Sequence, residues 1–354
     1  MVRLSLLFPV ILLAGTVAFL CSFPVQKLAL RKGFLDCPDS APHKLHQSAT
    51  PLGGGIVLLV SIWAGWMIFG TWHGSVIPGL LGATSLIMLW GLVDDRYGLE
   101  PLPKLAGQII ATVFLILAGI QAHIFSFNWA NYLITLFWMV GLSNAFNFVD
   151  SMDGLALGIA IIASGFFMLV TIDSGQPELA RLSAVLLGAG IGLMFLNTQP
   201  ARLFLGDSGA QLLGFLLAAI GIAYNPAGLP QEVSWFTPIL VLGVPVFDMV
   251  LVVFSRLRRK MPVYQAGHDH SYHRLVRMGL DSNRAVVGMH LIAGGLGLTA
   301  FILLGASVLW ANVIYFAILM ASIILILWLE FHNPVKAGQP DNNLRGVVDK
   351  EKVE

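Results

Sequence analysis

The sequence predicts an all-α, polytopic integral membrane protein. Of its 354 residues, 57% are apolar and only 11% are charged, and the mean hydropathy is +0.81. Soluble globular domains carry about 25% charged residues. The deficit extends along the whole chain, which excludes a soluble domain with a single membrane anchor. Apolar runs of about 20 residues, the length that crosses the hydrocarbon as a helix, recur up to about residue 330.

Length alone gives about 10 to 11 transmembrane helices. Several of the runs contain glycine and proline, which membrane helices tolerate. Some connections are barely long enough for a tight reversal, so ten spans with one half-buried segment is an alternative to eleven. The expected spans are 4–24, 53–70, 76–93, 105–123, 131–148, 155–172, 178–197, 208–225, 236–254, 284–306 and 310–330.

Lysine and arginine lie almost entirely on one side of this arrangement. Of the 20 such residues, only Arg3 and Arg181 fall on the other side. By the positive-inside rule the rich side is cytoplasmic, and it includes the two largest loops, 25–52 and 255–283. The first apolar run has no A-x-A cleavage site, so we expect a retained helix with its N-terminus outside.

The chain divides into one transmembrane domain, residues 1–331, and a polar cytoplasmic tail, residues 332–354, which we expect to be flexible. The formal net charge is only +1. No basic stripe lies outside the loops that a membrane protein would carry anyway, so nucleic acid is not an expected partner. The expected surroundings are membrane lipid.

Several carboxylates stand beside the membrane spans on the predicted cytoplasmic face. Each would cost about 2.5–3.5 kcal/mol at a helix centre, so we expect the protein to use them.

Asp94 and Asp95 end the third span. An adjacent pair cannot point both side chains the same way, so one could hold a metal or phosphate while the other acts as a base. The alternative is a helix-end turn in which Arg96 is their structural partner.

Two further acidic motifs follow the fifth span and precede the eighth. Asn147, Asp150 and Asp153 recur at intervals of three, which keeps Asn147 and Asp150 near one face of a continuing helix. Asp207 lies in Phe204-Leu-Gly-Asp-Ser-Gly, where glycines permit close approach and a helix N-terminus favours an anion. Mg²⁺ could bridge this carboxylate to phosphate oxygens. The alternative is that Asp153 and Asp207 only cap the helices they precede.

Three histidines, His268, His270 and His273, lie in the large basic loop. Their types and spacing suit zinc, whereas the surrounding arginines favour a polyphosphate, and a merely solvated loop is the third interpretation. Asp248 lies inside the ninth span, where an ionisable group is a functional candidate with Arg256 as its expected partner. A structural ion pair is the alternative there.

Lys44 and His46 lie shortly before the glycines 53–55, which open the second span. Glycines at this point could form a packing hinge between helices or a cradle for phosphate. Alone, this pattern does not distinguish the two.

In this order the motifs resemble the polyprenyl-phosphate N-acetylhexosamine-1-phosphate transferases of glycosyltransferase family 4. The pattern covers about residues 27–285 and is specific because it has many parts. It is most similar to bacterial enzymes that start O-antigen, common-antigen or teichoic-acid linkage synthesis from UDP-N-acetylglucosamine. The matching motifs are Lys-x-His with Pro-x-Gly-Gly, Asp-Asp, Asn-x-x-Asn-x-x-Asp-x-x-Asp-Gly, Phe-x-Gly-Asp-x-Gly, Pro-x-Phe-Asp and a histidine loop ending His-Arg-Leu.

The resemblance implies transfer of N-acetylhexosamine-1-phosphate, with N-acetylglucosamine as the first candidate sugar, from a UDP-sugar to undecaprenyl phosphate with release of UMP. It implies Mg²⁺ as the cofactor, with Mn²⁺ as the alternative ion. It places the protein in the bacterial inner membrane with its active site in cytoplasmic loops. Whether the enzyme forms a homodimer is left open.

The resemblance also implies roles for individual residues. Asp94 would deprotonate the lipid phosphate, with Asp95 beside it near the metal. Asp207 would be the clearest Mg²⁺ ligand, together with Asp95 and Asp150. Substrate contacts would come from Lys44, His46, Asn147, Asp150, Asp153, Phe204 (stacked on uracil), His270, His273 and Arg274, while His268 has no assigned counterpart.

Two related functions and one different class are the alternatives. A close relative could use another UDP-N-acetylhexosamine. The branch that uses UDP-MurNAc-pentapeptide, and makes the first lipid intermediate of peptidoglycan, usually has three consecutive histidines, which this loop lacks. A secondary transporter should carry its polar groups near the membrane midplane in symmetry-related halves, whereas here most of them lie at span ends.

Overall fold

The computed structural model describes residues 4–37, 49–72, 76–226, 234–263, 267 and 269–332. Within these residues, helices form nearly all of the regular structure. The elements are η1 (Leu4–Leu6), α1 (Phe8–Lys32), β1 (Leu35–Asp36), β2 (Thr50–Pro51), α2 (Gly54–Phe69), α3 (Ile77–Tyr97), α4 (Pro101–Leu117), α5 (Asn128–Val149), α6 (Leu155–Asp173), α7 (Pro177–Asn197), α8 (Gly206–Ala223), α10 (Phe236–Val241), α11 (Gly243–Arg258), α12 (Ser271–Arg277), α13 (Ser282–Leu303) and α14 (Val308–His332).

The all-α membrane fold predicted from the sequence is confirmed. Among the described residues, 8 helices are long and apolar enough to cross a membrane. Two more, α2 and α4, are apolar but shorter, with 16 and 17 residues. Together with a broken ninth segment, these helices account for every span expected from the sequence.

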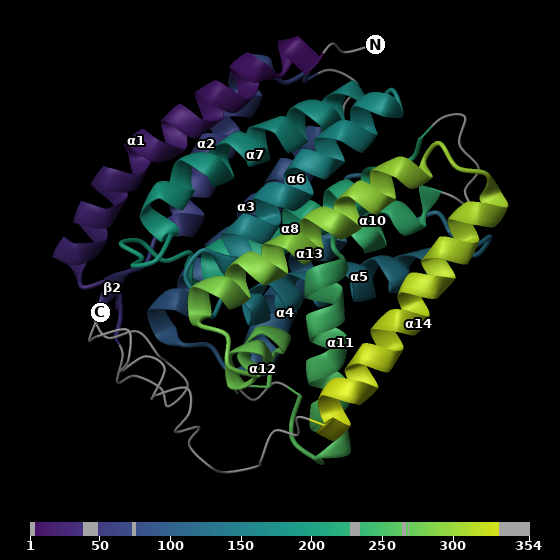
Figure 1. The fold of residues 1–354 in the computed structure, drawn as a ribbon. Helices are drawn as coiled ribbons and strands as arrows, with labels where there is room; N and C mark the ends of the chain where they lie inside the picture. The colour runs from purple at the N-terminus through teal and green to yellow at the C-terminus, as the bar shows by residue number, and fades with distance from the viewer. Residues whose placement is uncertain are drawn as a thin grey trace.

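The ninth expected span, residues 236–254, is not one continuous helix. It consists of α10, which ends at Val241, and α11, which begins at Gly243 and runs in a different direction (Figure 1). The physical reason is Pro245. Its ring lacks an N–H and crowds the carbonyl four residues earlier, which belongs to Val241.

Two helix boundaries differ from the expected spans in ways that bear on the site. The first helix, expected to end near residue 24, continues through Pro24 to Lys32 and stops at Gly33, whose φ is 65°. At about 1.5 Å per residue, this length carries its C-terminal end beyond the hydrocarbon. The fourth helix begins at Pro101 rather than residue 105, so Lys104 lies in its first turn.

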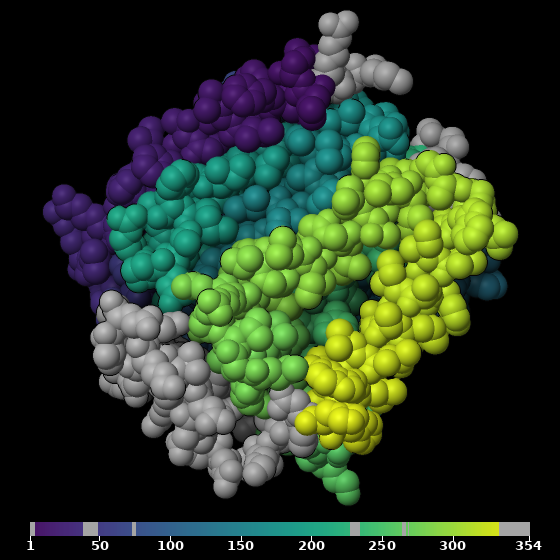
Figure 2. Space-filling view, viewed as in Figure 1, coloured from purple at the N-terminus to yellow at the C-terminus, as the bar shows by residue number. Residues whose placement is uncertain are grey.

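Helix α8 lies at the centre of the bundle (Figure 1). Every residue from Ser208 to Gly221 is buried, and its largest contacts are with α3 and α5. Helices α1 and α14, at the two ends of the described chain, lie on opposite edges of the molecule (Figure 2). The polar residues at the start of α8 are therefore surrounded by protein.

Helix α14 packs loosely along most of its length. Its buried residues are confined to two groups, one near each end. Tyr315 stacks on Phe236 with ring centroids 4.3 Å apart, and the other end packs Ile326 and Leu329 against Leu251. The helix is thus attached at two points.

A small antiparallel sheet joins α1 to the start of α8. Strand β1 pairs with β2, and the next residue, Leu52, forms a bridge with Phe204 just before α8. The backbone N–H groups of Gly53 and Gly54 donate to the Phe204 carbonyl at 3.3 and 2.9 Å. These contacts bring the glycine motif and the Phe-x-Gly-Asp motif together.

Candidate active site

The acidic motifs of α3, α5 and α8 meet at one end of the bundle. Asp94 and Asp95 lie in the last turn of α3, Asp150 ends α5, and Asp207 lies in the first turn of α8. The sequence predicted that these residues serve one site. Their convergence supports that prediction.

Asp95 binds the N-terminus of α8. Its Oδ1 accepts the backbone N–H of Asp207 at 2.6 Å, and its Oδ2 accepts that of Ser208 at 3.2 Å. A carboxylate is favoured there by the unpaired N–H groups and by the helix dipole. Gly206 is required because its φ is 71° and an added Cβ would lie 2.7 Å from Asp95 Oδ2. Asp95 therefore fixes the direction in which α8 starts.

Lys104 joins two of the acidic motifs. Its Nζ lies 2.7 Å from Asp94 Oδ2 and 2.7 Å from Asp207 Oδ1. Asp94 Oδ1 also accepts the backbone N–H of Leu99 at 2.9 Å. The sequence analysis did not select Lys104. Its position in the sequence, shortly after the acidic pair and at the start of an apolar helix, is the feature that could have identified it as a site residue.

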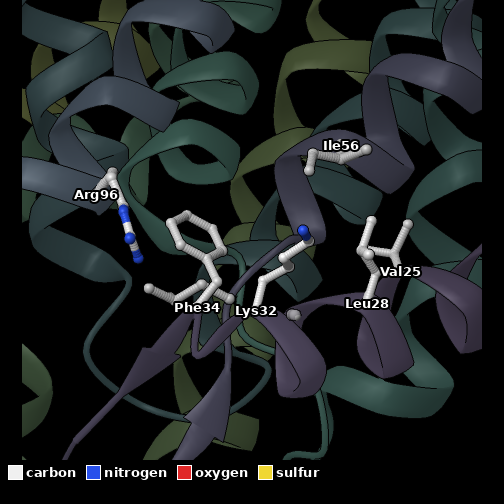
Figure 3. Close-up of a pocket in the computed structure, with 8 residues that line it drawn as sticks. Val25, Leu28, Lys32, Phe34, Ile56 and Arg96 are labelled. Atoms are coloured by element: carbon white, nitrogen blue, oxygen red, sulfur yellow. The ribbon is translucent and has the colours of Figure 1, made fainter.

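Arg96, the alternative partner for the acidic pair, points elsewhere. Along an α-helix, successive side chains are about 100° apart, so Arg96 projects roughly opposite to Asp94. It lines a groove beside Phe34 (Figure 3). Lys104 supplies the positive charge that the sequence interpretation assigned to Arg96.

Asp150 and Asp153 have different surroundings. Burial, followed by the charges of Asp207 and Asp95, raises the pKa of Asp150 well above its ordinary value. Asp153 Oδ2 accepts the backbone N–H of Ala201 at 2.9 Å, so it ties the α5–α6 turn to the segment before α8. Asp153 does not cap α6, whose N-cap is Gly154. Asn147 is half-buried on α5 nearby.

The donor set at this end suits a hard divalent cation. No group of three or more His, Cys, Asp or Glu in the described residues is arranged as a ready-made metal site. Mg²⁺, however, often binds one or two carboxylates and completes its shell with water and substrate phosphate. The side chain of Asp207 is 30% exposed, and its Oδ2 has no hydrogen-bond partner among the described residues. Asp207 therefore fits the predicted role.

Three amide side chains form a hydrogen-bonded network between the helices that carry the acidic residues. Gln108 Nε2 donates to Asn144 Oδ1 at 3.2 Å and to Gln211 Oε1 at 3.1 Å, while Asn144 Nδ2 donates to Gln108 Oε1 at 2.8 Å. This network joins α4, α5 and α8. Hydrogen bonds between amide side chains of different helices fix the relative positions of those helices.

The glycines at the start of α2 serve close packing. A Cβ added to Gly55 would lie 2.6 Å from Ser208 Oγ, and one added to Gly54 would lie 2.8 Å from Leu205 Cα. From the opposite side, a Cβ on Gly91 would lie 2.5 Å from Ser208 Cα. Of the two alternatives for this motif, the packing role is the one these contacts support.

The histidine segment is held by Asp248. Asp248 Oδ2 lies 2.8 Å from His270 Nδ1, while Oδ1 accepts both the backbone N–H and the Oγ–H of Ser271, at 2.7 and 2.6 Å. Asp248 is fully buried in α11. The sequence interpretation that paired Asp248 with Arg256 is wrong, because Arg256 pairs with Asp269 at 2.8 Å.

Four of the arginines around the histidines are paired with two carboxylates. Asp269 accepts Arg256 at 2.8 Å and Arg259 at 2.7 Å. Burial acts to raise the pKa of Asp269, but the hydrogen bonds and charge of Arg256 prevail and lower it to about 2. Glu330 of α14 accepts Arg258 at 2.7 Å and Arg274 at 2.8 Å. The positive charge predicted for a polyphosphate is therefore largely balanced within the protein.

Arg274 lies in the protein interior. Its side chain is 0% exposed, and besides Glu330 it donates to the carbonyls of Leu329 and Asp269 and to Ser255 Oγ. These contacts give it a positioning function between α11, α12 and α14. Its direct contact with substrate stays a prediction.

The histidine segment also contacts the acidic motif of α5. Tyr272 OH donates to the carbonyl of Phe148 at 2.9 Å and forms a hydrogen bond with Ser151 Oγ. His270 stacks against Tyr272 with ring centroids 5.3 Å apart. Asp150 lies between Phe148 and Ser151 in the sequence, so the two predicted halves of the site adjoin.

Some predicted roles are not settled by these contacts. Lys44, His46 and His268 lie outside the described residues. His273 is buried on α12, and the ring of Phe204 is half-buried. Their proposed contacts with substrate, including stacking on uracil, stay predictions.

Comparisons with known proteins agree on one family. Residues 77–225 match the family model described as glycosyl transferase family 4. A probable undecaprenyl-phosphate N-acetylglucosaminyl 1-phosphate transferase of Bacillus subtilis (strain 168) is 28% identical over 332 residues, covering 90% of each chain.

Two further relatives carry related names. The decaprenyl-phosphate N-acetylglucosaminephosphotransferase of Mycobacterium tuberculosis (strain CDC 1551 / Oshkosh) is 30% identical over 320 residues, covering 80% of this chain and 79% of that protein. The undecaprenyl-phosphate alpha-N-acetylglucosaminyl 1-phosphate transferase of Yersinia pestis is 28% identical over 306 residues, covering 81% of each. The similarity therefore extends beyond the region matched by the family model.

Proposed function

The chain belongs to glycosyl transferase family 4, and we propose that it transfers N-acetylglucosamine-1-phosphate from UDP-N-acetylglucosamine to undecaprenyl phosphate. It is a multi-pass membrane protein and a sugar-phosphate transferase. The names of the relatives support the undecaprenyl-phosphate acceptor and the transferred N-acetylglucosaminyl 1-phosphate group. The observation that carries the proposal is the bridge from Lys104 to Asp94 and Asp207, backed by Asp95 on the N-terminus of α8.

In the proposed reaction, an oxygen of the lipid phosphate attacks the phosphorus bonded to the sugar. A new P–O bond forms, the pyrophosphate P–O bond breaks, and UMP leaves with the bonding electrons. Asp94 takes any proton carried by the attacking oxygen. Its buried carboxylate, held by Leu99 N–H and Lys104, is fixed for that task.

Both substrates are anions, so the site must reduce their repulsion. Lys104 contributes one positive charge between Asp94 and Asp207. We propose that Asp207, with Asp95 and Asp150 near it, holds Mg²⁺, with Mn²⁺ as the alternative ion. The bound cation would neutralise phosphate charge as it develops. Burial is the main cause of the raised pKa of Asp150, and the negative charges of Asp207 and Asp95, which a cation would offset, add to it.

We further propose that this end of the bundle faces the cytoplasm of a bacterial inner membrane. The support is the lysine and arginine asymmetry of the loops. In a cysteine-free background, a cysteine replacing Tyr97, which is 76% exposed, should be shielded from an impermeant thiol reagent in intact cells. One replacing Trp129, which is 64% exposed at the start of α5, should be labelled. The reverse pattern would contradict the orientation.

The reaction is tested with the purified full chain, undecaprenyl phosphate and a panel of UDP-sugars. UMP release should require the lipid acceptor and should be fastest with UDP-N-acetylglucosamine. Faster release with UDP-N-acetylgalactosamine or UDP-MurNAc-pentapeptide would change the sugar but keep the reaction. No release with any member of the panel, under conditions where the protein stays folded, would contradict the proposed function.

A further inference from the structure

An open groove lies between α1, α2 and the end of α3, on the edge of the bundle formed by α1. It has a volume of about 340 Å³. Its floor and walls are apolar, and two cationic side chains enter it. Its lining includes Val25, Leu28, Lys32, Phe34 and Arg96.

The two cations stand on either side of an aromatic ring. Figure 3 shows Arg96 extending from α3 toward one side of Phe34, while Lys32 extends from the end of α1 on the other side. Among the described residues, neither Lys32 nor Arg96 has a carboxylate partner. This contrasts with Lys104 and with four arginines around the histidine segment, Arg256, Arg258, Arg259 and Arg274, each of which pairs with a carboxylate.

The apolar part of the groove is continuous with the outer surface of α1. Leu28 is 55% exposed, and Val25 is half-buried one turn earlier. Lys32 ends α1, and Arg96 lies in the last turn of α3. Cations at the ends of membrane helices generally meet phospholipid phosphates, and apolar side chains nearer the helix centre generally meet the hydrocarbon chains.

We propose that this groove binds one anionic phospholipid of the bilayer, with its phosphate between Lys32 and Arg96 and a hydrocarbon chain along Val25 and Leu28. Charge complementarity supports an anionic head group. Bound there, the lipid would join the ends of α1 and α3 at the point where α3 carries Asp94 and Asp95.

The geometry favours a structural phospholipid over the reacting acceptor. Arg96 projects roughly 200° around α3 from Asp94, at about 100° per residue. Asp94 faces Lys104 and Asp207. A phosphate held by Arg96 is therefore on the other side of α3 from the proposed reacting groups.

The test measures lipid binding by native mass spectrometry of the delipidated, detergent-solubilised full chain titrated with phosphatidylglycerol or phosphatidylcholine. The variants are Lys32→Gln, Arg96→Gln and the two together. Arg31→Gln is the matched control, because Arg31 is exposed at the same end of α1 but does not line the groove. Elution profile and thermal unfolding confirm that each variant is folded.

We expect one phosphatidylglycerol to bind more tightly than phosphatidylcholine. Each single substitution in the groove should weaken that binding by about tenfold, as for loss of a hydrogen bond to a charged group, and the pair by more. Arg31→Gln should change it less than twofold. The single variants keep the test informative if the double variant fails to fold.

Three outcomes would overturn the proposal. Equal binding of the two phospholipids would remove the charge-based site. An equal loss in Arg31→Gln would show general attraction to a basic surface. Displacement of phosphatidylglycerol by equimolar undecaprenyl phosphate, with the loss confined to the groove variants, would assign the groove to the acceptor. None of these measurements depends on turnover, so the proposal can fail while the proposed function stands.

Discussion

The acidic cluster and the histidine segment are both rich in charge, but they hold it differently. In the acidic cluster, the side chains of Lys104 and Asp207 are 18% and 30% exposed, and one cation is shared between two carboxylates. Around the histidines, Arg274 and Glu330 are both 0% exposed and each has several partners. The first region is accessible to a ligand and has unused acceptor capacity. The second region is structural, because its buried ion pairs hold α11, α12 and α14 together.

This difference separates effects on turnover from effects on folding. Removing a charge from an accessible site changes what it can bind, because water can solvate the group that remains. Removing one partner of a buried pair leaves the other uncompensated, which costs about 3–5 kcal/mol. The variants below use this contrast, in order of expected effect.

Asp207→Asn should have the largest effect on turnover. It removes one charge from the proposed metal site but keeps the size of the side chain, so we expect turnover to fall by about 10³-fold while the chain stays folded. Turnover and thermal unfolding should be measured on the same preparation. Asp173→Asn, at the exposed end of α6, is the matched control and should be neutral. Near-normal turnover with unchanged Mg²⁺ dependence would remove Asp207 from the metal site.

Asp94→Asn should lower kcat by about 10²-fold, the lower end of the range typical of general acid–base groups, with a smaller change in KM. The measurement is a full kinetic series in both substrates. Lys104→Gln provides a comparison, because it removes the bridging charge and leaves the carboxylate. If Asp94→Asn raises KM for the UDP-sugar and leaves kcat intact, Asp94 binds substrate and is not the base.

Glu330→Gln should affect stability first. The substitution leaves Arg258 and Arg274 without their shared charge partner, so we expect a loss of about 3–5 kcal/mol in the free energy of unfolding. Denaturant or thermal unfolding in detergent measures it. Glu330→Asp should recover part of the loss, and Asp281→Asn, in an exposed i,i+3 pair with Arg284, should cost under about 1 kcal/mol. Equal stability of Glu330→Gln and the parent would show that Glu330 does not stabilise the fold through these ion pairs.

The titration of Asp269 gives the smallest effect, a pH dependence of stability. Because its pKa is lowered to about 2, its ion pairs contribute stability above the unfolded value of about 3.9, and the contribution is lost as pH falls toward 2. The contribution amounts to about 2.5 kcal/mol. Asp269→Asn should therefore flatten the stability profile between about pH 4 and pH 2. A variant whose profile parallels the parent's in that interval would show that Asp269 does not titrate with folding.

The sequence predicted the parts of this molecule that local pattern determines. Apolar run length gave the membrane helices, and carboxylates at the ends of those runs gave Asp94, Asp150 and Asp207. Pro245 lies at the break between α10 and α11, but the sequence analysis predicted one continuous helix there. Such features depend on residues near one another in the chain.

The partners of the charged residues could not be predicted in the same way. Glu330 lies 56 residues from Arg274 and 72 from Arg258 in the sequence. No motif surrounds it, so the sequence did not indicate that it pairs with these arginines. Asp248 was paired with Arg256 by helical spacing, whereas the chain folds back so that His270 reaches it first. Long-range contacts of this kind follow from packing, which one sequence does not reveal.

The attachment of α14 through Glu330 has a consequence for biogenesis. Helix α14 follows all the other described helices in the chain, so the membrane receives Arg258 and Arg274 before it receives their partner. Until α14 is inserted, Arg274 lacks the carboxylate that pairs with it, whatever the state of the acidic cluster. A nascent or truncated product that stops before Glu330 would therefore carry a buried arginine without its charge partner, although every acidic residue of the site is present.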